Sequence, residues 1–227
     1  MSNIVKMVVF DMAGTTINED NLVYKTLLTA INNAGYMLTL EQVLAEGAGK
    51  EKKQAIRSIL SIYLNIVDEK LIDQIYDNFV EQLGAAYKHF EVKPQPNATE
   101  LFNKLKEQNI LTVLNTGYNR ETAELLLAKL EWKEGQTFDT LVTASDVPKN
   151  RPNPDMIFHA MQKFGINDGS LVAKVGDSII DIEEGKNAGC GLTIGITTGA
   201  HTKTQLQQAN PDAIIDNLSQ LSALVIH

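Results

Sequence analysis

Apolar runs and amphipathic stretches alternate along most of this chain. Runs that are mostly apolar, without polar alternation, predict strands that are buried on both faces of a sheet. These runs lie at Ile4–Phe10, Ile110–Leu114, Thr140–Val142, Leu171–Val175, Leu192–Ile196 and Ala213–Ile215. Apolar positions at helical spacing predict helices between them, at Ala98–Gln108, Arg120–Leu130, Pro154–Phe164 and Ile179–Ala188. Strands that alternate with helices are typical of an α/β protein, so we predict a Rossmann-like, doubly wound parallel sheet.

The pattern between the first strand and the rest of the sheet is helical, with no convincing strand before Glu91. Apolar positions at helical spacing predict helices at Leu22–Ala34, Thr39–Glu46, Glu51–Asn65 and Glu69–His89. The prolines of the segment 94–97 then mark a stiff return to the sheet. We therefore predict a core formed by residues 1–16 and 92–227 and an inserted all-helical cap formed by residues 17–91. An insertion directly after the first strand should cover the carboxyl edge of the sheet and Asp11, where that strand stops.

Composition narrows the range of functions. A length of 227 residues suits one large domain or a core with an insertion. The net charge of -8 opposes binding to nucleic acid or anionic lipid, because both would be repelled. With Cys190 as its one cysteine, the chain can form neither an internal disulfide nor a thiolate metal cluster. The first apolar run is too short for a signal peptide and no stretch reaches membrane-spanning length, so we expect a cytoplasmic protein without membrane or nucleic-acid partners. A homodimer is left open.

Polar residues stand where the predicted strands end, which is where open α/β sheets bind their ligands. They are Asp11, Thr116 with Gly117, Asp177 with Asp181, and Arg151 in a turn before a helix. The three acids would make an oxygen-rich site suited to Mg²⁺, and the hydroxyl and backbone N–H groups could hold an anion. A guanidinium could bridge a carboxylate and a phosphoryl oxygen. Each residue has a structural alternative as a helix cap, a helix-start acid or a solvated charge, but their agreement in position favours a site.

In the order in which these residues follow one another, the chain resembles the haloacid dehalogenase (HAD) superfamily. Asp11 matches its nucleophile motif, Thr116 its hydroxyl motif, Arg151 its basic motif, and Asp177 with Asp181 its acidic motif. More narrowly, the chain resembles the phosphonatase branch, whose enzymes cleave a carbon–phosphorus bond with Mg²⁺ and a Schiff-base lysine from the cap. The segments that carry this closer resemblance are Asp11–Thr16, Thr116–Tyr118, Val147–Pro152 and Thr198–Thr202.

The resemblance implies a role for each matched residue. Asp11 would attack phosphorus and, with the Ala13 carbonyl and Asp177, would hold Mg²⁺. Asp181 would be an outer-shell acid. The phosphoryl oxygens would be bound by Thr116, Gly117 and Arg151.

Ala13 separates this chain from ordinary phosphatases of the superfamily. Those enzymes carry a second Asp two positions after the nucleophile, which protonates the leaving alkoxide. General acid catalysis is commonly worth about 10²- to 10⁴-fold, so its absence should disable ordinary phosphomonoester cleavage. A cap lysine that condenses with an aldehyde or ketone would be a natural substitute, because an iminium accepts electrons as the bond to phosphorus breaks.

Lys52 is the candidate for that lysine. In phosphonatases the Schiff-base lysine stands three residues after a glycine and five before an arginine, and Lys52 has this spacing from Gly49 and Arg57. We expect burial and the neighbouring Lys50 and Lys53 to favour its neutral form. The alternative is that Lys52, like those neighbours, is a solvated charge. The chain departs from the branch at Ala48 and Ala55, where the pattern has Met and His.

The sequence thus predicts a Mg²⁺-dependent hydrolase that transfers a phosphoryl group from a small carbonyl phosphonate to Asp11. Its partner would be a small anionic phosphonate or phosphate. One alternative is a phosphatase for substrates with good leaving groups, in which Lys52 only binds. Alternatives of another class are a non-catalytic aspartyl-phosphate switch, although such a switch has no reason to carry a cap, and a binding protein with a decayed site.

Overall fold

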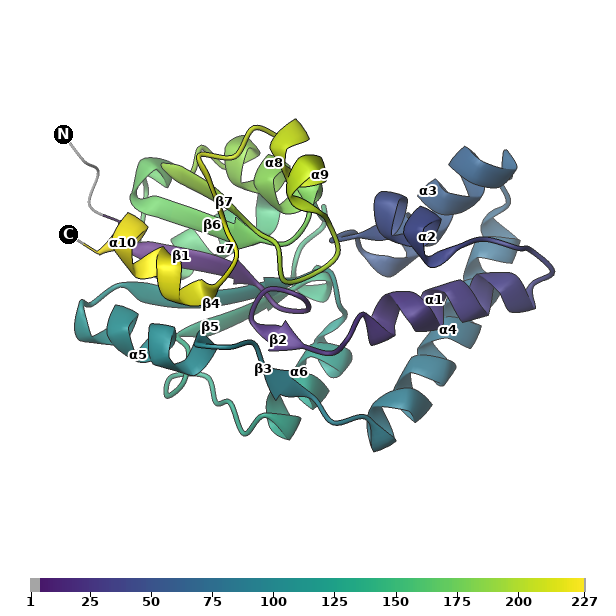
Figure 1. The fold of residues 1–227 in the computed structure, drawn as a ribbon, viewed down its shortest axis with the longest axis horizontal. Helices are drawn as coiled ribbons and strands as arrows, with labels where there is room; N and C mark the ends of the chain where they lie inside the picture. Colours follow the sequence, from purple (N-terminus) through teal and green to yellow (C-terminus); the bar gives the residue numbers. More distant parts are fainter. Residues whose placement is uncertain (1–4, 227) are drawn as a thin grey trace.

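The computed structural model of this chain describes residues 5–226 and has a parallel sheet at its centre (Figure 1). The sheet has six strands in the order β5-β4-β1-β6-β7-β8, and every neighbouring pair is parallel. The strands are β1 (Met7–Asp11), β4 (Leu111–Thr116), β5 (Thr140–Thr143), β6 (Val172–Gly176), β7 (Leu192–Ile196) and β8 (Ala213–Ile215). The predicted α/β class and parallel Rossmann-like sheet are confirmed.

Helices cover both faces of this sheet. They are α5 (Ala98–Glu107), α6 (Arg120–Lys129), α7 (Asp155–Lys163), α8 (Ile179–Asn187), α9 (Lys203–Gln208) and α10 (Ser222–Val225). Successive side chains of a strand point to opposite faces, and β1 follows this rule. Val8 and Phe10 belong to one apolar cluster, whereas Met7 and Val9 belong to the other. The uninterrupted apolar pattern of β1 is therefore explained by burial on both sides.

Four further helices project from one end of the core, beyond the strand ends (Figure 1). They are α1 (Leu22–Asn33), α2 (Leu40–Gly47), α3 (Lys52–Leu64) and α4 (Glu69–His89). Local capping explains where three of them begin, because side chains of Thr39, Glu51 and Asp68 accept hydrogen bonds from the first-turn N–H groups of α2, α3 and α4. The division of the chain at residues 16/17 and 91/92 stays a prediction.

A short antiparallel pair lies at the base of these helices. Strand β2 (Ile17–Asn18) pairs with β3 (Lys93–Pro94), so the chain enters and leaves the helical segment side by side. The expectation of no strand between Thr16 and Glu91 is therefore wrong. Two residues are too few to show a period of two, and a proline usually argues against a strand. Helices α9 and α10 were also not predicted.

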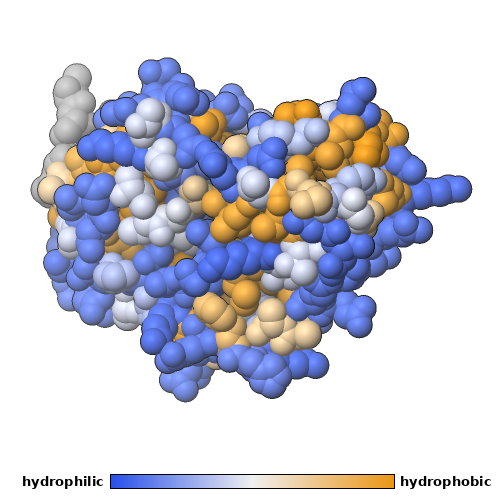
Figure 2. Space-filling model, turned by 45° about the vertical axis from the view of Figure 1, so that its right-hand side comes forward, coloured by the Kyte–Doolittle hydropathy of each residue, from blue (hydrophilic) through white to orange (hydrophobic). Residues whose placement is uncertain are grey.

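The surface is mostly polar, with apolar side chains gathered mainly on the helical end (Figure 2). The large exposed apolar residues there are Met37, Ile62, Val67 and Val80, while Leu125 and Phe158 lie on the core. Among residues 5–226, no helix combines the length and apolar character needed to cross a membrane. The homodimer stays a prediction.

Candidate active site

Asp11 stands at the carboxyl end of β1, in the middle of the sheet between β4 and β6. The register pairs Asp11 with Asn115, so Thr116 follows one residue later at the same edge. Both Asp11 and Thr116 are buried. The convergence of strand ends expected from the sequence therefore brings the candidate nucleophile and the candidate anion-binding hydroxyl together.

A tight turn follows Asp11. The backbone N–H groups of Thr15, Thr16 and Ile17 donate to the Met12 carbonyl at 3.2, 2.9 and 2.8 Å. Gly14 has a φ of 87°, a left-handed conformation that glycine adopts without strain. The Thr16 hydroxyl donates back to the Asp11 carbonyl at 3.0 Å. This turn fixes the backbone on which the Asp11 carboxylate and the Ala13 carbonyl are presented.

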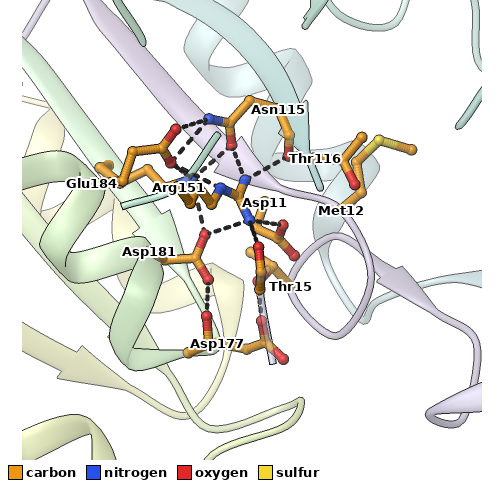
Figure 3. Close-up of polar contacts among 12 residues, drawn as sticks. Asp11, Met12, Thr15, Asn115, Thr116, Arg151, Asp177, Asp181 and Glu184 are labelled. Atoms are coloured by element: carbon orange, nitrogen blue, oxygen red, sulfur yellow. Dashed lines mark hydrogen bonds and ion pairs between the residues drawn. The ribbon is translucent and has the colours of Figure 1, made fainter. Parts of the chain in front are cut away.

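Arg151 is fully buried, and its guanidinium contacts the Asp11 carboxylate (Figure 3). Its Nη1 donates to Asp11 Oδ1 at 2.7 Å and lies 2.9 Å from Asp181 Oδ1. Its Nε donates to Glu184 Oε2 at 2.9 Å, and its Nη2 donates to the backbone and side-chain oxygens of Asn115. Burial opposes the charge, but Asp181, Glu184 and Asp11 outweigh burial and raise the pKa of Arg151. The guanidinium is thus permanently charged and held rigidly beside Asp11.

Three residues that the sequence analysis did not single out complete this network: Lys174, Asn115 and Glu184. The Lys174 ammonium lies 2.6 Å from Asn115 Oδ1 and 3.0 Å from both Asp181 Oδ1 and Glu184 Oε2. The Asn115 amide donates to Glu184 Oε1 at 3.0 Å. A lysine inside an apolar strand was the available signal, because a fully buried ammonium is costly unless it is paired.

The two acids after β6 have different surroundings. Asp181 is paired with Arg151 and Lys174, which together overcome the effect of burial and hold the pKa of Asp181 below its usual value. Asp177 has no basic partner within the described part of the chain. Its Oδ2 accepts a hydrogen bond from the Ala200 N–H at 2.6 Å, and its Oδ1 lies 3.5 Å from the Thr15 hydroxyl. Asp181 therefore supports the arginine, whereas Asp177 is a carboxylate without a counter-ion.

The donor set around Asp11 and Asp177 suits a magnesium ion. Burial, together with repulsion from Asp11 and Asp181, raises the pKa of Asp177 well above its usual value. Burial and Asp181 likewise raise the pKa of Asp11 in spite of Arg151. Within residues 5–226, no three His, Cys, Asp or Glu side chains gather closely enough to hold a metal alone. Two carboxylates, the Ala13 carbonyl and water would form the hard oxygen set that Mg²⁺ prefers, because it commonly keeps several waters.

Lys52 is the first residue of α3, with Glu51 as the helix cap. Although carried by the helical segment, it is buried, and its Nζ donates to the Lys50 carbonyl at 2.8 Å. The same nitrogen lies 5.3 Å from the ring centres of Tyr24 and Tyr118. Burial lowers the pKa of Lys52 to about 8, even though Glu51 and Asp11 act in the opposite direction. The positive end of the α3 dipole also disfavours an ammonium here.

The expected cause of this lowered pKa was partly wrong. Burial does lower it, but the main neighbouring charge that adds to burial is Arg151. Lys50 Nζ instead donates to Ser58 at 3.2 Å and lies 3.8 Å from Glu46, while Lys53 Nζ donates to Asp73 at 2.8 Å. Neighbours in sequence at a helix start point in different directions, so they need not share an environment.

Most of the predicted site residues line one small cavity. It is lined by Asp11, Ala13, Thr116, Gly117, Tyr118 and Arg151 from the core and by Tyr24, Gly49 and Lys52 from the helical segment. Asp177 and Asp181 do not line it. Its volume is only about 10 Å³, close to the least that holds one water. A phosphoryl group therefore needs the two parts to move apart. They are joined by polar contacts, such as Gln54 Nε2 to the Arg151 carbonyl at 3.3 Å, and by an apolar cluster that includes Tyr24 and Tyr118.

Comparison with protein families identifies the group to which this arrangement belongs. Residues 8–205 match the family model of haloacid dehalogenase-like hydrolases. The chain belongs to this family. The predictions of the superfamily and of a hydrolase are thereby confirmed.

Curated relatives of this HAD hydrolase include several phosphonoacetaldehyde hydrolases. The protein of that name from Parabacteroides distasonis is 32% identical over 206 residues, covering 86% of this chain and 76% of the relative. The one from Latilactobacillus sakei is 29% identical, covering 97% and 95% of the two chains. The resemblance to the phosphonatase branch is therefore also confirmed.

Solved structures show the same fold. A phosphonoacetaldehyde hydrolase-like protein from Oleispira antarctica has a TM-score of 0.83 at 26% identity, over 99% of this chain and 92% of that one. A hydrolase from Pseudomonas syringae has a TM-score of 0.85 at 19% identity, over 96% and 97% of the chains. At 19% identity, the second match shows similarity of fold alone.

Gly117 offers a test of how closely the helical segment must approach the core of this HAD hydrolase. A Cβ at Gly117 would lie 2.8 Å from the Lys50 carbonyl oxygen and 3.0 Å from that of Gly49. Gly117→Ala should therefore hold the two parts apart and lower kcat/KM for phosphate release by about tenfold or more, since small misplacements can cost about 10²-fold. The matched control is Gly84→Ala in α4, where an added Cβ meets nothing within 4 Å. Equal rates for both variants would show that this close approach is not needed.

Proposed function

We propose that this HAD hydrolase is a cytoplasmic, Mg²⁺-dependent phosphonatase that cleaves the carbon–phosphorus bond of a small aldehyde or ketone phosphonate. Asp11 is the nucleophile, while Thr116, Gly117 and Arg151 bind the phosphoryl oxygens. Lys52 forms an imine with the carbonyl group. The names of the curated relatives support this substrate class, because several are phosphonoacetaldehyde hydrolases.

The observation that carries this proposal is the meeting of Lys52 and Asp11 at one cavity. In the proposed substrate the carbonyl carbon is bonded to the carbon that carries phosphorus. Its phosphorus has to reach a nucleophilic carboxylate, and its carbonyl carbon has to reach an amine. With a pKa of about 8 in place of 10.5, the neutral fraction of Lys52 at pH 7 is about 300-fold larger than that of an ordinary lysine. The amine is therefore available for attack near neutral pH.

The proposed reaction begins with the imine. The neutral Lys52 amine adds to the carbonyl carbon, and the resulting carbinolamine takes up one proton from solvent and loses water, which leaves an iminium cation. A carboxylate oxygen of Asp11 attacks phosphorus, and the electron pair of the carbon–phosphorus bond moves into the iminium to give an enamine. Water hydrolyses the aspartyl phosphate to phosphate, and protonation and hydrolysis of the enamine release the carbonyl product and Lys52.

Other residues prepare the reacting groups. Arg151 keeps Asp11 in place and offsets phosphoryl charge, and Lys174 with Glu184 keeps Arg151 in place. Asp11, the Ala13 carbonyl and Asp177 would hold Mg²⁺, with Asp181 outside the ligand set. When bound, the ion would offset the charge that otherwise repels the attacking carboxylate from the phosphoryl oxygens.

The pH dependence of kcat/KM is a direct consequence. For a carbonyl phosphonate it should rise as Lys52 loses its proton, with an apparent pKa of about 8. Below that value the rate should fall about tenfold per pH unit, because only the neutral amine attacks. Phosphate release from an ester substrate in the same buffers is the control, since it needs no imine. A carbonyl-phosphonate profile that is flat between roughly pH 6 and 9 would contradict imine formation by this lysine.

The second candidate is a phosphatase for esters with good leaving groups, with Lys52 as a binding cation. The buried Ala48 and Ala55 favour it, because they replace the Met and His of the phosphonatase pattern. A panel of carbonyl phosphonates and phosphate esters, assayed for phosphate release with and without Mg²⁺, separates the two. Mg²⁺-dependent release from a carbonyl phosphonate is the expected result; release from esters alone would replace the first proposal by the second.

A further inference from the structure

A chain of buried polar groups lies behind Lys52. Glu19, between β2 and α1, accepts a hydrogen bond from the Tyr87 hydroxyl at 3.0 Å. The Tyr87 hydroxyl lies 3.1 Å from the hydroxyl of Tyr118, which belongs to the loop after β4. Glu19, Tyr87 and Tyr118 are 1%, 0% and 3% exposed. Three polar groups from distant parts of the sequence are thus joined out of contact with solvent.

The direction of these hydrogen bonds follows from their acceptor end. Glu19 Oε2 accepts from the Val23 backbone N–H at 2.9 Å as well as from the Tyr87 hydroxyl. Tyr87 has one hydroxyl proton, and it is used on Glu19. The Tyr118 hydroxyl must therefore donate to the Tyr87 oxygen. Its proton then points to the Tyr87 oxygen, and the Tyr87 proton points to Glu19.

The chain ends against Lys52. The ring of Tyr118 lies 5.3 Å from Lys52 Nζ, and the ring of Tyr24 lies at the same distance. The Tyr24 hydroxyl is itself fixed, because it accepts from the Gly49 N–H at 2.9 Å. No carboxylate forms an ion pair with Lys52 in the described segment, whereas Lys50 and Lys53 each have one. Lys52 is therefore held between two aromatic rings and a carbonyl.

We propose that Glu19 and Tyr87 are positioning residues for Lys52, a proposal that rests on the function given above. Acting through the hydroxyl of Tyr118, they fix its ring against the Lys52 nitrogen. Glu19 also supplies a remote negative charge that stabilises a cation on that nitrogen, whether ammonium or iminium.

The arrangement meets two opposed needs of an imine lysine. A carboxylate in direct contact would hold the proton on the amine and oppose attack on a carbonyl. Without any negative charge, a buried iminium would be poorly stabilised. Aromatic faces stabilise a cation without accepting its proton. A carboxylate placed two hydroxyl groups away adds a weaker, longer-range attraction.

The charges around both groups agree with this coupling. Burial raises the pKa of Glu19 to about 7, and Lys52 and Lys25 lower it in part. In return Glu19, with Glu51 and Asp11, raises the pKa of Lys52 against the effects of burial and Arg151. Removing the charge of Glu19 should therefore lower the pKa of Lys52 further.

Two variants separate charge from hydrogen bonding. Glu19→Gln keeps an oxygen that can accept from Val23 and Tyr87 but removes the charge, while Tyr87→Phe breaks the chain and leaves the charge. The matched control is Tyr63→Phe, because Tyr63 lies in α3 and takes no part in the hydrogen bonds that join Glu19, Tyr87 and Tyr118. Thermal unfolding would establish that all variants are folded.

The first measurement needs no turnover. Lys52 is methylated with formaldehyde and cyanoborohydride across a pH series, and the extent is read by peptide mass spectrometry with Lys50 and Lys53 as internal references. Glu19→Gln should shift the midpoint of Lys52 labelling to lower pH and at least double its rate at pH 7. Tyr87→Phe should likewise move the midpoint of Lys52 labelling to lower pH and leave the midpoints of Lys50 and Lys53 unchanged. Midpoints that stay unchanged in both folded variants would overturn the proposal.

The second measurement ties the chain to catalysis. With a carbonyl phosphonate, both variants should lose about tenfold in plateau kcat with little change in KM, while the acidic limb of the profile moves to lower pH. A merely structural role would lower thermal stability and leave that limb in place. If phosphate is released from esters alone, the proposed function fails, yet the labelling shift still decides whether Glu19 and Tyr87 act on Lys52.

Discussion

Asp11→Asn should abolish phosphate release from every substrate of this enzyme, with a loss of at least about 10³-fold in kcat. The variant removes the nucleophile and a proposed metal ligand in one step. It should still fold, because the asparagine oxygen can accept the hydrogen bond that Arg151 now gives to Asp11 at 2.7 Å. Arg151 also keeps Asp181 and Glu184 as partners. Phosphate release and thermal unfolding measure the two effects.

Asp20→Asn is the matched control, since Asp20 pairs with Lys25 on the surface with its side chain 75% exposed. It should leave kcat and KM unchanged. Undiminished release by a folded Asp11→Asn variant would remove Asp11 as the nucleophile. Loss of structure in that variant would instead mean that the Arg151 network needs the Asp11 charge.

Lys52→Arg has the second large expected effect, and it is selective. The guanidinium keeps a positive charge but cannot form an imine, so release from a carbonyl phosphonate should fall by roughly 10³-fold, as for other groups that act in the transition state. Release from an ester with a good leaving group should change much less. The ratio of the two rates in one preparation is the measurement, because a folding defect lowers both.

Lys53→Arg serves as its control, since Lys53 lies one residue away and pairs with Asp73 at the surface. Both rates should stay at the parent level. If Lys52→Arg lowers ester and phosphonate turnover equally, Lys52 is a binding cation, and the phosphatase alternative gains the support that the phosphonatase loses.

The parts of the site that the sequence predicted share one cause. Asp11, Thr116 and Asp177 directly end or follow strands, and parallel strands bring their carboxyl ends to one edge. Their proximity follows from the order of elements along the chain. Lys52 could be predicted from its spacing to Gly49 and Arg57. Its surroundings could not, because they depend on where α3 begins and on tyrosines from two other segments, Tyr24 and Tyr118.

The parts that the sequence did not predict are buried polar groups whose partners are far apart along the chain. Lys174 lies inside an apolar run, and its pairing with Glu184 depends on how α8 packs against the sheet. Glu19 looks like an ordinary acid before a helix, yet its partner Tyr87 is 68 residues away. The pair β2–β3 was missed for a different reason, because two residues carry no periodic signal.

Imine formation by Lys52 is tested most directly by trapping the imine. The enzyme, with Mg²⁺ present, is mixed with a carbonyl phosphonate and reduced with borohydride, and the modified peptide is identified by mass spectrometry. Imine formation by Lys52 predicts inactivation that needs both substrate and borohydride, with one reduced adduct on Lys52 and none on Lys50 or Lys53. Efficient cleavage of the carbonyl phosphonate with no adduct at Lys52 would contradict it.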